Sequence, residues 1–516
     1  MKRIFLFLFA VVLTPTFAIN YYVSPTGNDN NNGLSSSTPF QTLDYAASLT
    51  IPGDTVFLMN GIHTSSLPNN NILNIYNSGT EASRITYTNF PGETPILKMF
   101  GNNWGGIALQ GADYITVEGI TIIGNNDNIS LEYAQSQQLN TSNPSTSGNG
   151  IGIVPEYNND ANKPHHNIVR NCTVSKCGGG GIYTYNADYT TIENNTVSEC
   201  GWYSPYDNSG ISMYQNWNSD TFTGIKNYIV GNTCYRNENY IPFFAVGSIT
   251  DGNGIIIDDG RNTQNGSTLG IYTAQTYIAN NLIFDNGGRG IHCYESDNVI
   301  IVNNTCYKNC QSPFTREGEL TAFDASNITY LNNIAAPDTD IPPIFAYAAT
   351  TSNTTSQYNL FTANETLASP IGTTNSVGNA GFMLASSNPV IADFHLQATS
   401  DALNSGTLSN APLLDKDGIV RLSNGTIDMG CYEFQNTFNV TNFSMNGVTV
   451  YPNPVTSFLH IDFTIKNEKI KVVNLQGQIV YTNENPGETI DFSTFQNGIY
   501  FLSFEKQNKT IKVVKQ

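Results

Sequence analysis

The chain has 516 residues, a formal net charge of −19 at pH 7, 12% charged residues and 39% hydrophobic residues. This acidity excludes nucleic acid as an expected partner, because a polyanion would be repelled unless a basic patch or a bound cation intervened. The hydrophobic content excludes a largely disordered chain and suffices for a long folded core.

The N-terminus has the features of a secretory signal peptide. Lys2 and Arg3 precede an apolar run over residues 4–13, and small residues lead to a cleavage site after Ala18. The run is shorter than the roughly 20 apolar residues that span a bilayer, and no later segment is long enough. We therefore expect residues 1–18 to be a signal peptide and the mature protein to pass through the periplasm without a membrane span.

A short helix is predicted over residues 38–47, with Pro39 near its start. It precedes the first expected strand, at residues 53–58. Stacked strands expose their edges and core at an open end, so such an end needs a cover. We interpret the helix as an N-terminal cap.

A Gly-Ile phrase occurs five times in the middle of the chain. Each occurrence is followed by a phrase rich in Asn and β-branched residues, with short period-2 strands, Gly/Asn turns and no segment of helical length. Strands that repeat without helices between them stack into a solenoid, which tolerates insertions in single coils. The sequence therefore predicts an all-β chain whose main body, residues 19–435, is a right-handed parallel β-helix. The phrases begin at Gly150, Gly181, Gly210, Gly254 and Gly290.

An asparagine recurs in register in the second phrase. Amide side chains at one turn of a stack can donate to the same residue one coil away, which predicts an asparagine ladder. Its expected members are Asn195, Asn232, Asn281, Asn304 and Asn333.

The eight cysteines show no CxxC spacing, so a zinc site is not expected. Cys177 and Cys200 fall in one column of adjacent coils, where a disulfide is sterically possible. The segment from residues 393–397 to residues 428–434 is predicted to close the C-terminal end of the coil.

Several motifs resemble a known family. Residues 21–29, Pro39-Phe40 and residues 52–56 resemble the opening of secreted bacterial proteins of the pectate-lyase-like β-helix superfamily, and residues 393–434 resemble their usual ending. The resemblance implies a right-handed β-helix that works on an extracellular polysaccharide.

The last part of the chain has a different character. After a linker at residues 436–446, residues 447–516 predict a compact β-rich module that opens with Val450-Tyr451-Pro452-Asn453-Pro454. The module resembles the C-terminal sorting domain of the type IX secretion system of Bacteroidetes. This resemblance implies that the type IX machinery is a partner and that the protein is secreted or held at the cell surface.

Strand alternation predicts a functional face. In each Gly-Ile phrase the first and third residues after Gly are expected to point into the coil, so the second and fourth point outward. Stacking brings the outward residues side by side, about 4.8 Å apart. The outward set includes Tyr183, Tyr185, Tyr214, Asp258, His292 and Tyr294, with Gln215, Asp259 and Glu295 in the next column and Asp207, Asp251 and Arg289 just before the glycines.

Rings, amides and carboxylates on one face suit a sugar chain, because rings stack on its C–H faces and polar groups bind its hydroxyls. The predicted substrate-binding residues are Tyr183, Tyr185, Tyr214, Tyr294, Gln215 and Glu295. The predicted catalytic residues are Asp258, Asp259, His292 and Arg289.

The leading hypothesis is a lyase that cleaves a uronic-acid polymer by β-elimination. Arg289, or a Ca²⁺ ion held by Asp251, Asp258 and Asp259, would neutralise the substrate carboxylate. His292 or Tyr294 would remove the proton. No organic cofactor is expected. The chain lacks the Ser-Asp-Asp-Gly cluster followed by a catalytic lysine that marks one pectate lyase family.

Two alternatives stay open. A glycoside hydrolase would use Asp258 or Asp259 together with Asp251 or Glu295 as its carboxyl pair. A non-catalytic adhesin or glycan-binding protein would need only the tyrosine face.

Overall fold

The computed structural model describes residues 18–65, 67–347, 349–362, 374–421, 426–435, 448–451, 455–463, 469–474, 478–483, 489–504 and 509–515. All of the expected signal peptide except Ala18 lies outside these residues. The chain divides into two units, residues 1–434 and residues 435–516, which are described separately.

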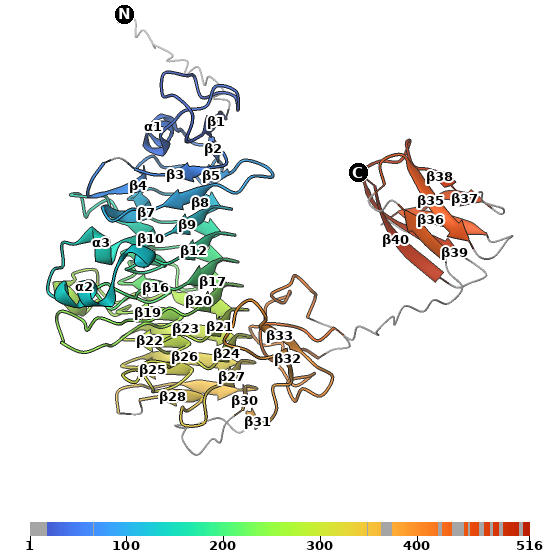
Figure 1. Ribbon diagram of the computed structural model, residues 1–516. Helices are drawn as coiled ribbons and strands as arrows, with labels where there is room; N and C mark the ends of the chain where they lie inside the picture. Colours follow the sequence, from blue (N-terminus) through green and yellow to red (C-terminus); the bar gives the residue numbers. More distant parts are fainter. Residues whose placement is uncertain are drawn as a thin grey trace, which may run out of the picture. The chain divides into compact units, whose positions relative to one another are not determined.

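The first unit is a stack of coils, each contributing one strand to each of three parallel sheets (Figure 1). This arrangement confirms the predicted parallel β-helix. We name the sheets I, II and III in the order in which each coil visits them. Sheet I contains β1 (Asn20–Val23), β2 (Thr55–Leu58), β5 (Ile85–Asn89), β8 (Ile115–Glu118), β11 (Ile168–Arg170), β14 (Thr191–Glu193), β17 (Ile225–Val230), β20 (Gln275–Ala279), β23 (Asp297–Val302), β26 (Ser326–Leu331) and β29 (Thr355–Gln357).

The other two sheets have the same parallel order. Sheet II contains β3 (Ile62–His63), β6 (Ile96–Lys98), β9 (Thr121–Ile123), β12 (Thr173–Ser175), β15 (Thr196–Ser198), β18 (Thr233–Tyr235), β21 (Leu282–Phe284), β24 (Thr305–Tyr307), β27 (Ile334–Ala336), β30 (Leu360–Phe361) and β31 (Ser376–Val377). Sheet III contains β4 (Asn70–Ile75), β7 (Asn103–Gln110), β10 (Asn149–Val154), β13 (Ile182–Tyr185), β16 (Ile211–Tyr214), β19 (Ile255–Asp258), β22 (Ile291–Tyr294), β25 (Leu320–Phe323) and β28 (Ile344–Ala346).

The five Gly-Ile phrases are neighbouring strands of sheet III, as predicted. The isoleucine after each glycine pairs with the isoleucine of the next coil. The predicted inward residues are all buried in one continuous core. Because parallel strands have side-chain period 2, this burial fixes which residues face outward.

The asparagine ladder lies at the turn between sheets I and II. Each side-chain Nδ2 donates to the Oδ1 of the next asparagine, at 3.0 Å from Asn195 to Asn232 and 2.9 Å from Asn281 to Asn304. The same pattern joins the other predicted members and continues through Asn359 and Asn375. The ladder is therefore confirmed and is longer than predicted.

A second ladder, which was not predicted, lies at the turn between sheets II and III. Asn237 donates to Asn286 and Asn286 donates to Asn309, at 2.9 and 2.7 Å. Asn309 then donates through its backbone N–H and its side chain to the two oxygens of buried Glu319, at 2.9 and 2.5 Å. A carboxylate thus ends this row of amides.

The N-terminal cap begins later than predicted. The helix α1 is Leu43–Leu49, and it buries Leu43, Ala46 and Ala47 against the first coils. Residues 38–42 are not helical, because Phe40 bridges to β1: its N–H donates to Tyr22 and its carbonyl accepts from Ser24. The prediction of a cap is confirmed in kind, but its first residues belong to the sheet edge.

The segment predicted to close the C-terminal end does something else. It includes β33 (Asp393–Leu396), which pairs with β32 (Phe382–Leu384) just before the segment, and it packs on the outer face of sheet II. Phe394 and Tyr432 cover Leu282 and Phe284, which are outward residues of β21. Because β21 carries large apolar side chains on its outer face, it needs this cover. The prediction of an end cap was therefore wrong.

All eight cysteines are buried and free, so the structure contains no disulfide between Cys177 and Cys200. Within the described residues, no helix is long and apolar enough to cross a membrane.

The second unit consists of two antiparallel sheets over one apolar core that includes Leu459, Ile470 and Leu502. This agrees with the predicted β-rich module. One sheet contains β34 (Val448–Tyr451), β35 (Phe458–Phe463) and β38 (Thr489–Asp491), and the other contains β37 (Ile479–Asn483), β36 (Ile470–Asn474), β39 (Gly498–Phe504) and β40 (Lys509–Lys515).

Replacing Asn281 by Ala should destabilise the β-helix. Asn281 accepts from the backbone and side chain of Asn232 and donates to Asn304 and to the carbonyl of Ile229. The variant leaves these buried groups without partners, at a cost of about 2 kcal/mol or more. We expect thermal unfolding to begin several degrees lower, whereas the exposed Asn140→Ala should unfold like the wild type. Equal melting temperatures for Asn281→Ala and the wild type would contradict a stabilising ladder.

Stability should also depend on the protonation of Glu319. Burial raises the pKa of this carboxyl from 4.5 to about 7, despite two hydrogen bonds from Asn309. Between these values the folded state binds a proton that the unfolded state has released. The contribution of this proton to the free energy of unfolding is therefore fully present below about pH 4 and is lost as the pH rises through about 7.

Melting temperatures of the wild type and Glu319→Gln, measured from about pH 4 to 8, test this linkage. The amide cannot ionise, so the melting temperature of the variant should rise relative to that of the wild type as the pH increases. Parallel curves for the two proteins would rule out the assignment.

Candidate functional site

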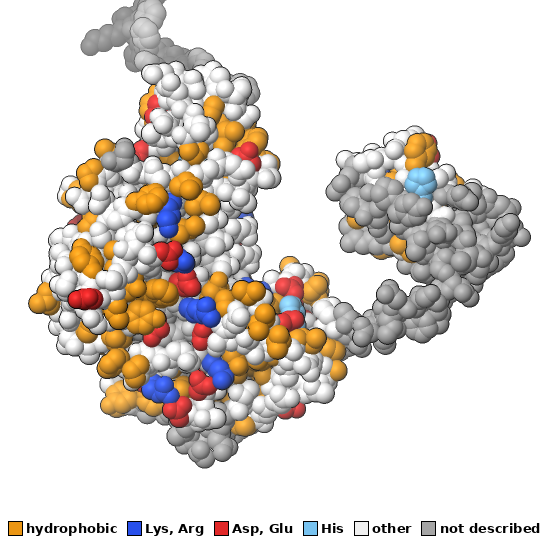
Figure 2. Space-filling view, in the orientation of Figure 1, with side chains coloured by type: hydrophobic (Ala, Val, Ile, Leu, Met, Phe, Trp, Pro, Cys, Tyr) orange, Lys and Arg blue, Asp and Glu red, His pale blue; other side chains and the backbone are white. Residues whose placement is uncertain are grey.

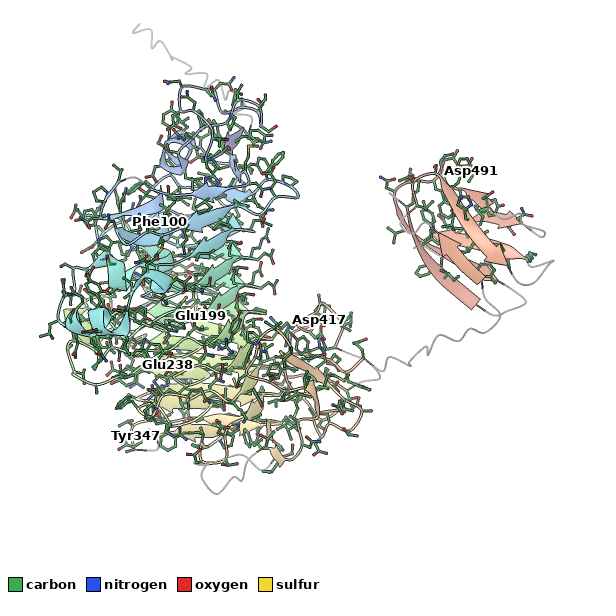
Figure 3. All side chains as sticks on the ribbon, in the orientation of Figure 1. Phe100, Glu199, Glu238, Tyr347, Asp417 and Asp491 are labelled. Carbon is green, nitrogen blue, oxygen red and sulfur yellow. The ribbon has the colours of Figure 1, made fainter. Side chains whose placement is uncertain are left out.

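An exposed row of side chains runs across the coils on the outer face of sheet III. Strand pairing places Tyr185 beside Tyr214, Tyr214 beside Asp258, Asp258 beside Tyr294 and Tyr294 beside Phe323. Tyr347, which directly follows β28, extends the row next to Phe323, and Figure 3 labels it. We call these six residues the central row: Tyr185, Tyr214, Asp258, Tyr294, Phe323 and Tyr347.

One carboxyl group thus interrupts a row of rings. Tyr185 is 38% exposed, and its ring stacks with that of Tyr214 at 5.7 Å between centroids and an interplanar angle of 18°. The amide of Asn265 donates to the Tyr214 hydroxyl at 2.7 Å, so the loop after β19 fixes this ring. The predicted juxtaposition of Tyr185, Tyr214, Asp258 and Tyr294 is therefore present.

Asp258 has the electrostatics of a proton donor. Burial, followed by the charges of Asp251 and Asp259, raises its pKa well above the ordinary value of 3.8. Its hydrogen bond from the Gln264 amide is long, at 3.3 Å, and offsets little of this effect. A carboxyl that keeps its proton near neutral pH can act as a general acid.

Glu295 lies next to Asp258. The Nε2 atom of Gln264 that contacts Asp258 also contacts Glu295, at 3.2 Å, and Thr263 donates to the same Glu295 oxygen at 2.9 Å. A single amide nitrogen therefore lies between the two carboxyl groups. Glu295 is partly exposed, so both groups are accessible from the same face.

Asp259 and Gln215 lie below this surface. Asp259 is fully buried and accepts from the backbone of Thr263 at 2.8 Å and of Gln264 at 2.9 Å. Gln215 donates at 2.7 Å to the same Oδ2 of Asp259 that accepts from Gln264, and it is itself 2% exposed. These contacts support a role for both side chains in shaping the loop that positions Gln264.

The outward side chains two residues after each glycine, such as Tyr183 and His292, are more covered than those four residues after it. His292 is only 4% exposed, and its Nδ1 lies 2.7 Å from the Thr321 hydroxyl. Burial and the charge of Arg289 lower its pKa well below the ordinary value of 6.5, so the ring is neutral at pH 7. Tyr183 leans over Gly152, where an added Cβ would meet its ring at 2.7 Å, and burial raises its pKa to about 12.

Arg289 is the cation next to the central row. Its guanidinium lies 5.8 Å from the Phe323 ring centre and 2.8 Å from Glu317, and it donates to the carbonyl of Thr250. Its Nε is buried and has no hydrogen-bond partner in the structure. The guanidinium is thus held in place by Glu317 and Thr250, and its Nε is left without a hydrogen-bond acceptor.

Two of the three aspartates predicted to bind Ca²⁺, Asp251 and Asp259, accept close hydrogen bonds from the protein. Asp251 accepts from Thr250 at 2.8 Å and from Asn253 at 2.7 Å, and Asp259 is used by its loop. Among the described residues, no group of three or more His, Cys, Asp or Glu side chains is placed to hold a metal ion. The structure therefore does not bring Asp251, Asp258 and Asp259 together as a ligand set.

Most Lys and Arg side chains of the β-helix are paired with carboxylates. Figure 2 shows Lys and Arg side chains next to Asp and Glu side chains, and ion pairs such as Lys176–Asp127 and Lys308–Asp338 join neighbouring coils. Asp258 differs from these carboxylates, because its neighbours in the row are rings.

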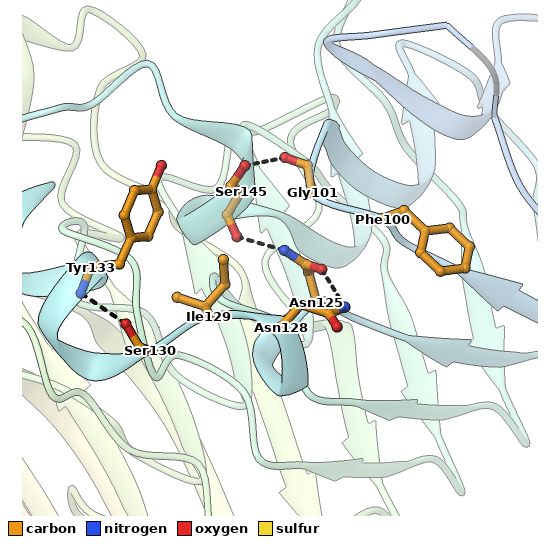
Figure 4. Close-up of a pocket in the computed structure, with 8 residues that line it drawn as sticks. All are labelled: Phe100, Gly101, Asn125, Asn128, Ile129, Ser130, Tyr133 and Ser145. Carbon is orange, nitrogen blue, oxygen red and sulfur yellow. Dashed lines mark hydrogen bonds between the residues drawn. The ribbon is translucent and has the colours of Figure 1, made fainter.

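A separate pocket of about 630 Å³ lies where sheet II passes to sheet III in an earlier coil (Figure 4). The 3-10 helix Asn126–Asn128, α2 (Leu131–Ser136) and α3 (Pro144–Ser147) belong to the insertion that forms its walls. Its polar groups are bonded to one another, as between Asn125 and Asn128 at 2.9 Å. It is lined by Phe100, Gly101, Asn125, Asn128, Ile129, Ser130, Tyr133 and Ser145.

Residues 21–327 match the family model described as "Pel9A-like, right handed beta helix region". The chain belongs to this Pel9A-like family. The match supplies the handedness of the coil and confirms the β-helix resemblance found in the sequence. It includes the central row from Tyr185 to Phe323 and ends before Tyr347.

Residues 449–516 match the model of a secretion system C-terminal sorting domain. The resemblance of the tail to a sorting domain is thereby confirmed. The protein is directed to the cell surface or to secretion by this domain.

Solved structures with similar coils include pectate lyase Pel9A, with 16% identity, a TM-score of 0.48 and coverage of 81% of this chain and 97% of that one. A rhamnogalacturonan lyase has 14% identity, a TM-score of 0.40 and coverage of 66% and 87%. The GH136 lacto-N-biosidase from Eubacterium ramulus has 16% identity, a TM-score of 0.38 and coverage of 66% and 56%. No curated protein matches the sequence. Identities this low assign no reaction to this chain.

Proposed function

We propose that this Pel9A-like protein cleaves an extracellular polysaccharide that lies along the central row, across the coils. The observation that carries the proposal is the single carboxyl group of Asp258 between rings on both sides. Exposed rings bind the C–H faces of sugars, and a solenoid face offers an extended site to an extended polymer. Export by the sorting domain places the protein where such polymers occur.

The first candidate reaction is β-elimination on a uronic-acid polymer. Membership of a family named after a pectate lyase supports it. Arg289, the cation beside Phe323 of the row, would stabilise the charge that develops on the substrate carboxylate. His292, which is neutral at pH 7, or Tyr294 would remove the proton.

The second candidate is hydrolysis, which a different observation favours. The pKa of Asp258 is raised well above its ordinary value by burial, and Glu295 shares the Gln264 amide with it. Two carboxyl groups close together, one as acid and one as base or nucleophile, are the usual machinery of glycoside hydrolysis. The third possibility, a non-catalytic glycan binder, would use the rings of the row alone.

Cleavage products distinguish the reactions. Elimination yields an unsaturated sugar that absorbs in the ultraviolet, whereas hydrolysis yields reducing ends without this absorbance. Asp258→Asn should lower kcat at least about 100-fold in either reaction, because both need a proton donor to the leaving oxygen and the variant removes the one proposed here. Arg289→Gln should be equally damaging only to elimination.

Glu193→Gln, on the outer face of sheet I, is the matched control and should retain full activity. Full activity of both Asp258→Asn and Arg289→Gln would show that the site lies elsewhere. Binding of polysaccharide without either product would instead establish the glycan binder.

A calcium requirement can be tested separately. The sequence predicts a Ca²⁺ ion at Asp251, Asp258 and Asp259, whereas Asp251 and Asp259 accept hydrogen bonds from the protein in the structure. We expect cleavage to continue after removal of calcium by a chelator. A loss of activity that added Ca²⁺ restores would mean that the three aspartates rearrange around the ion.

A further inference from the structure

A cluster of three rings lies at the end of the central row that is formed by β25 and β28. The ring of Phe323 is 5.6 Å from that of Phe345 and 6.0 Å from that of Tyr347, and Phe345 and Tyr347 are 6.5 Å apart. Tyr347 is 47% exposed, and the other two rings are partly exposed. We call Phe323, Phe345 and Tyr347 the distal cluster.

The backbone presents the cluster in a fixed way. The Tyr347 N–H donates to the carbonyl of Ala322 at 2.9 Å, and the Tyr347 carbonyl accepts from Thr350 and Thr351 at 3.1 and 2.9 Å. The guanidinium of Arg289 lies 5.8 Å from the Phe323 ring centre. Rings held in this way lose little conformational freedom when a ligand binds.

The position of the cluster relates it to Asp258. Tyr347 lies three strands from Asp258 in sheet III, which corresponds to roughly 14 Å along the stack. Tyr185 and Tyr214 lie on the opposite side of Asp258. A polymer lying across Asp258 would therefore meet rings on both sides.

We infer that the distal cluster is a sugar-binding subsite for the same polysaccharide chain that passes over Asp258, an inference that rests on the proposed function. It takes an uncharged sugar unit. The rings offer stacking surfaces, and partly exposed Asp324, which directly follows Phe323, would repel a carboxylate. Phe345 and Tyr347 lie beyond the family match, which ends at residue 327, whereas Phe323 lies within it.

The subsite can be measured by binding alone. The full chain carrying Asp258→Asn, which does not consume the ligand, is run in native gels that contain a neutral xylan, a neutral galactan or polygalacturonate. Adding Tyr347→Ala should weaken retardation by a neutral polymer roughly 5- to 10-fold. Tyr347→Phe keeps the ring and should therefore be retarded by the neutral polymer as strongly as the chain with Tyr347.

Tyr228→Ala is the matched control, because Tyr228 is a 36% exposed tyrosine of β17 whose ring contacts Tyr277 at 6.0 Å on sheet I. It should leave retardation unchanged. The subsite is overturned if Tyr347→Ala binds like its parent while Tyr214→Ala binds more weakly, or if none of the three polymers retards the parent. It is also overturned if only polygalacturonate binding depends on Tyr347, or if Tyr347→Ala instead abolishes self-association in sedimentation.

The same variants separate the two proposals. If Tyr347→Ala weakens binding but the active chain yields neither unsaturated products nor reducing ends, the proposed function fails and the subsite stands. If the active chain cleaves a polymer and Tyr347→Ala has no effect on its binding, the proposed function stands and the subsite fails.

Discussion

The site depends on one constraint, the fixed register of parallel strands from coil to coil. Backbone hydrogen bonds hold neighbouring strands about 4.8 Å apart, and the asparagine ladder joins the turns between sheets I and II from Asn195 to Asn375. A slip by one residue in any coil would turn its outward side chains into the core. Residues as distant in sequence as Tyr185 and Tyr347 can share one row only because this register is kept.

The loops differ from coil to coil and give the row its local chemistry. The loop after β19 returns over the sheet through Gln264, because Asp259 accepts from Thr263 and Gln264. The loop also places the Gln264 amide at Asp258, whose pKa is raised mainly by burial. Tyr185, in a coil with a short turn, stays exposed. The β-helix thus fixes positions, while its insertions control burial and proton affinity.

Local periodicity made much of this fold predictable. The alternation after Gly210 or Gly254 is a property of a few adjacent residues, so the inward and outward sets could be assigned without knowing the coil. The second ladder could not, because its asparagines are followed by loops of different length and its last member is Glu319. Phe323 and Tyr347 were missed since their strands lack the Gly-Ile start. The burial of His292 and the C-terminal segment's position on sheet II depend on tertiary packing, which no short motif encodes.

Electrostatics sets a condition on any substrate of the row. The carboxyl groups near Asp258 include Asp251, Asp259 and Glu295, and the nearby cation, Arg289, is already paired with Glu317. An anionic polymer must therefore either displace Glu317 from Arg289 or bring its own cations, whereas a neutral polymer needs neither. Burial of an unpaired charge is unfavourable, so the environment of Asp258 favours its protonated state in the free protein. A proton on this carboxyl group suits protonation of a leaving oxygen better than abstraction of a proton from carbon.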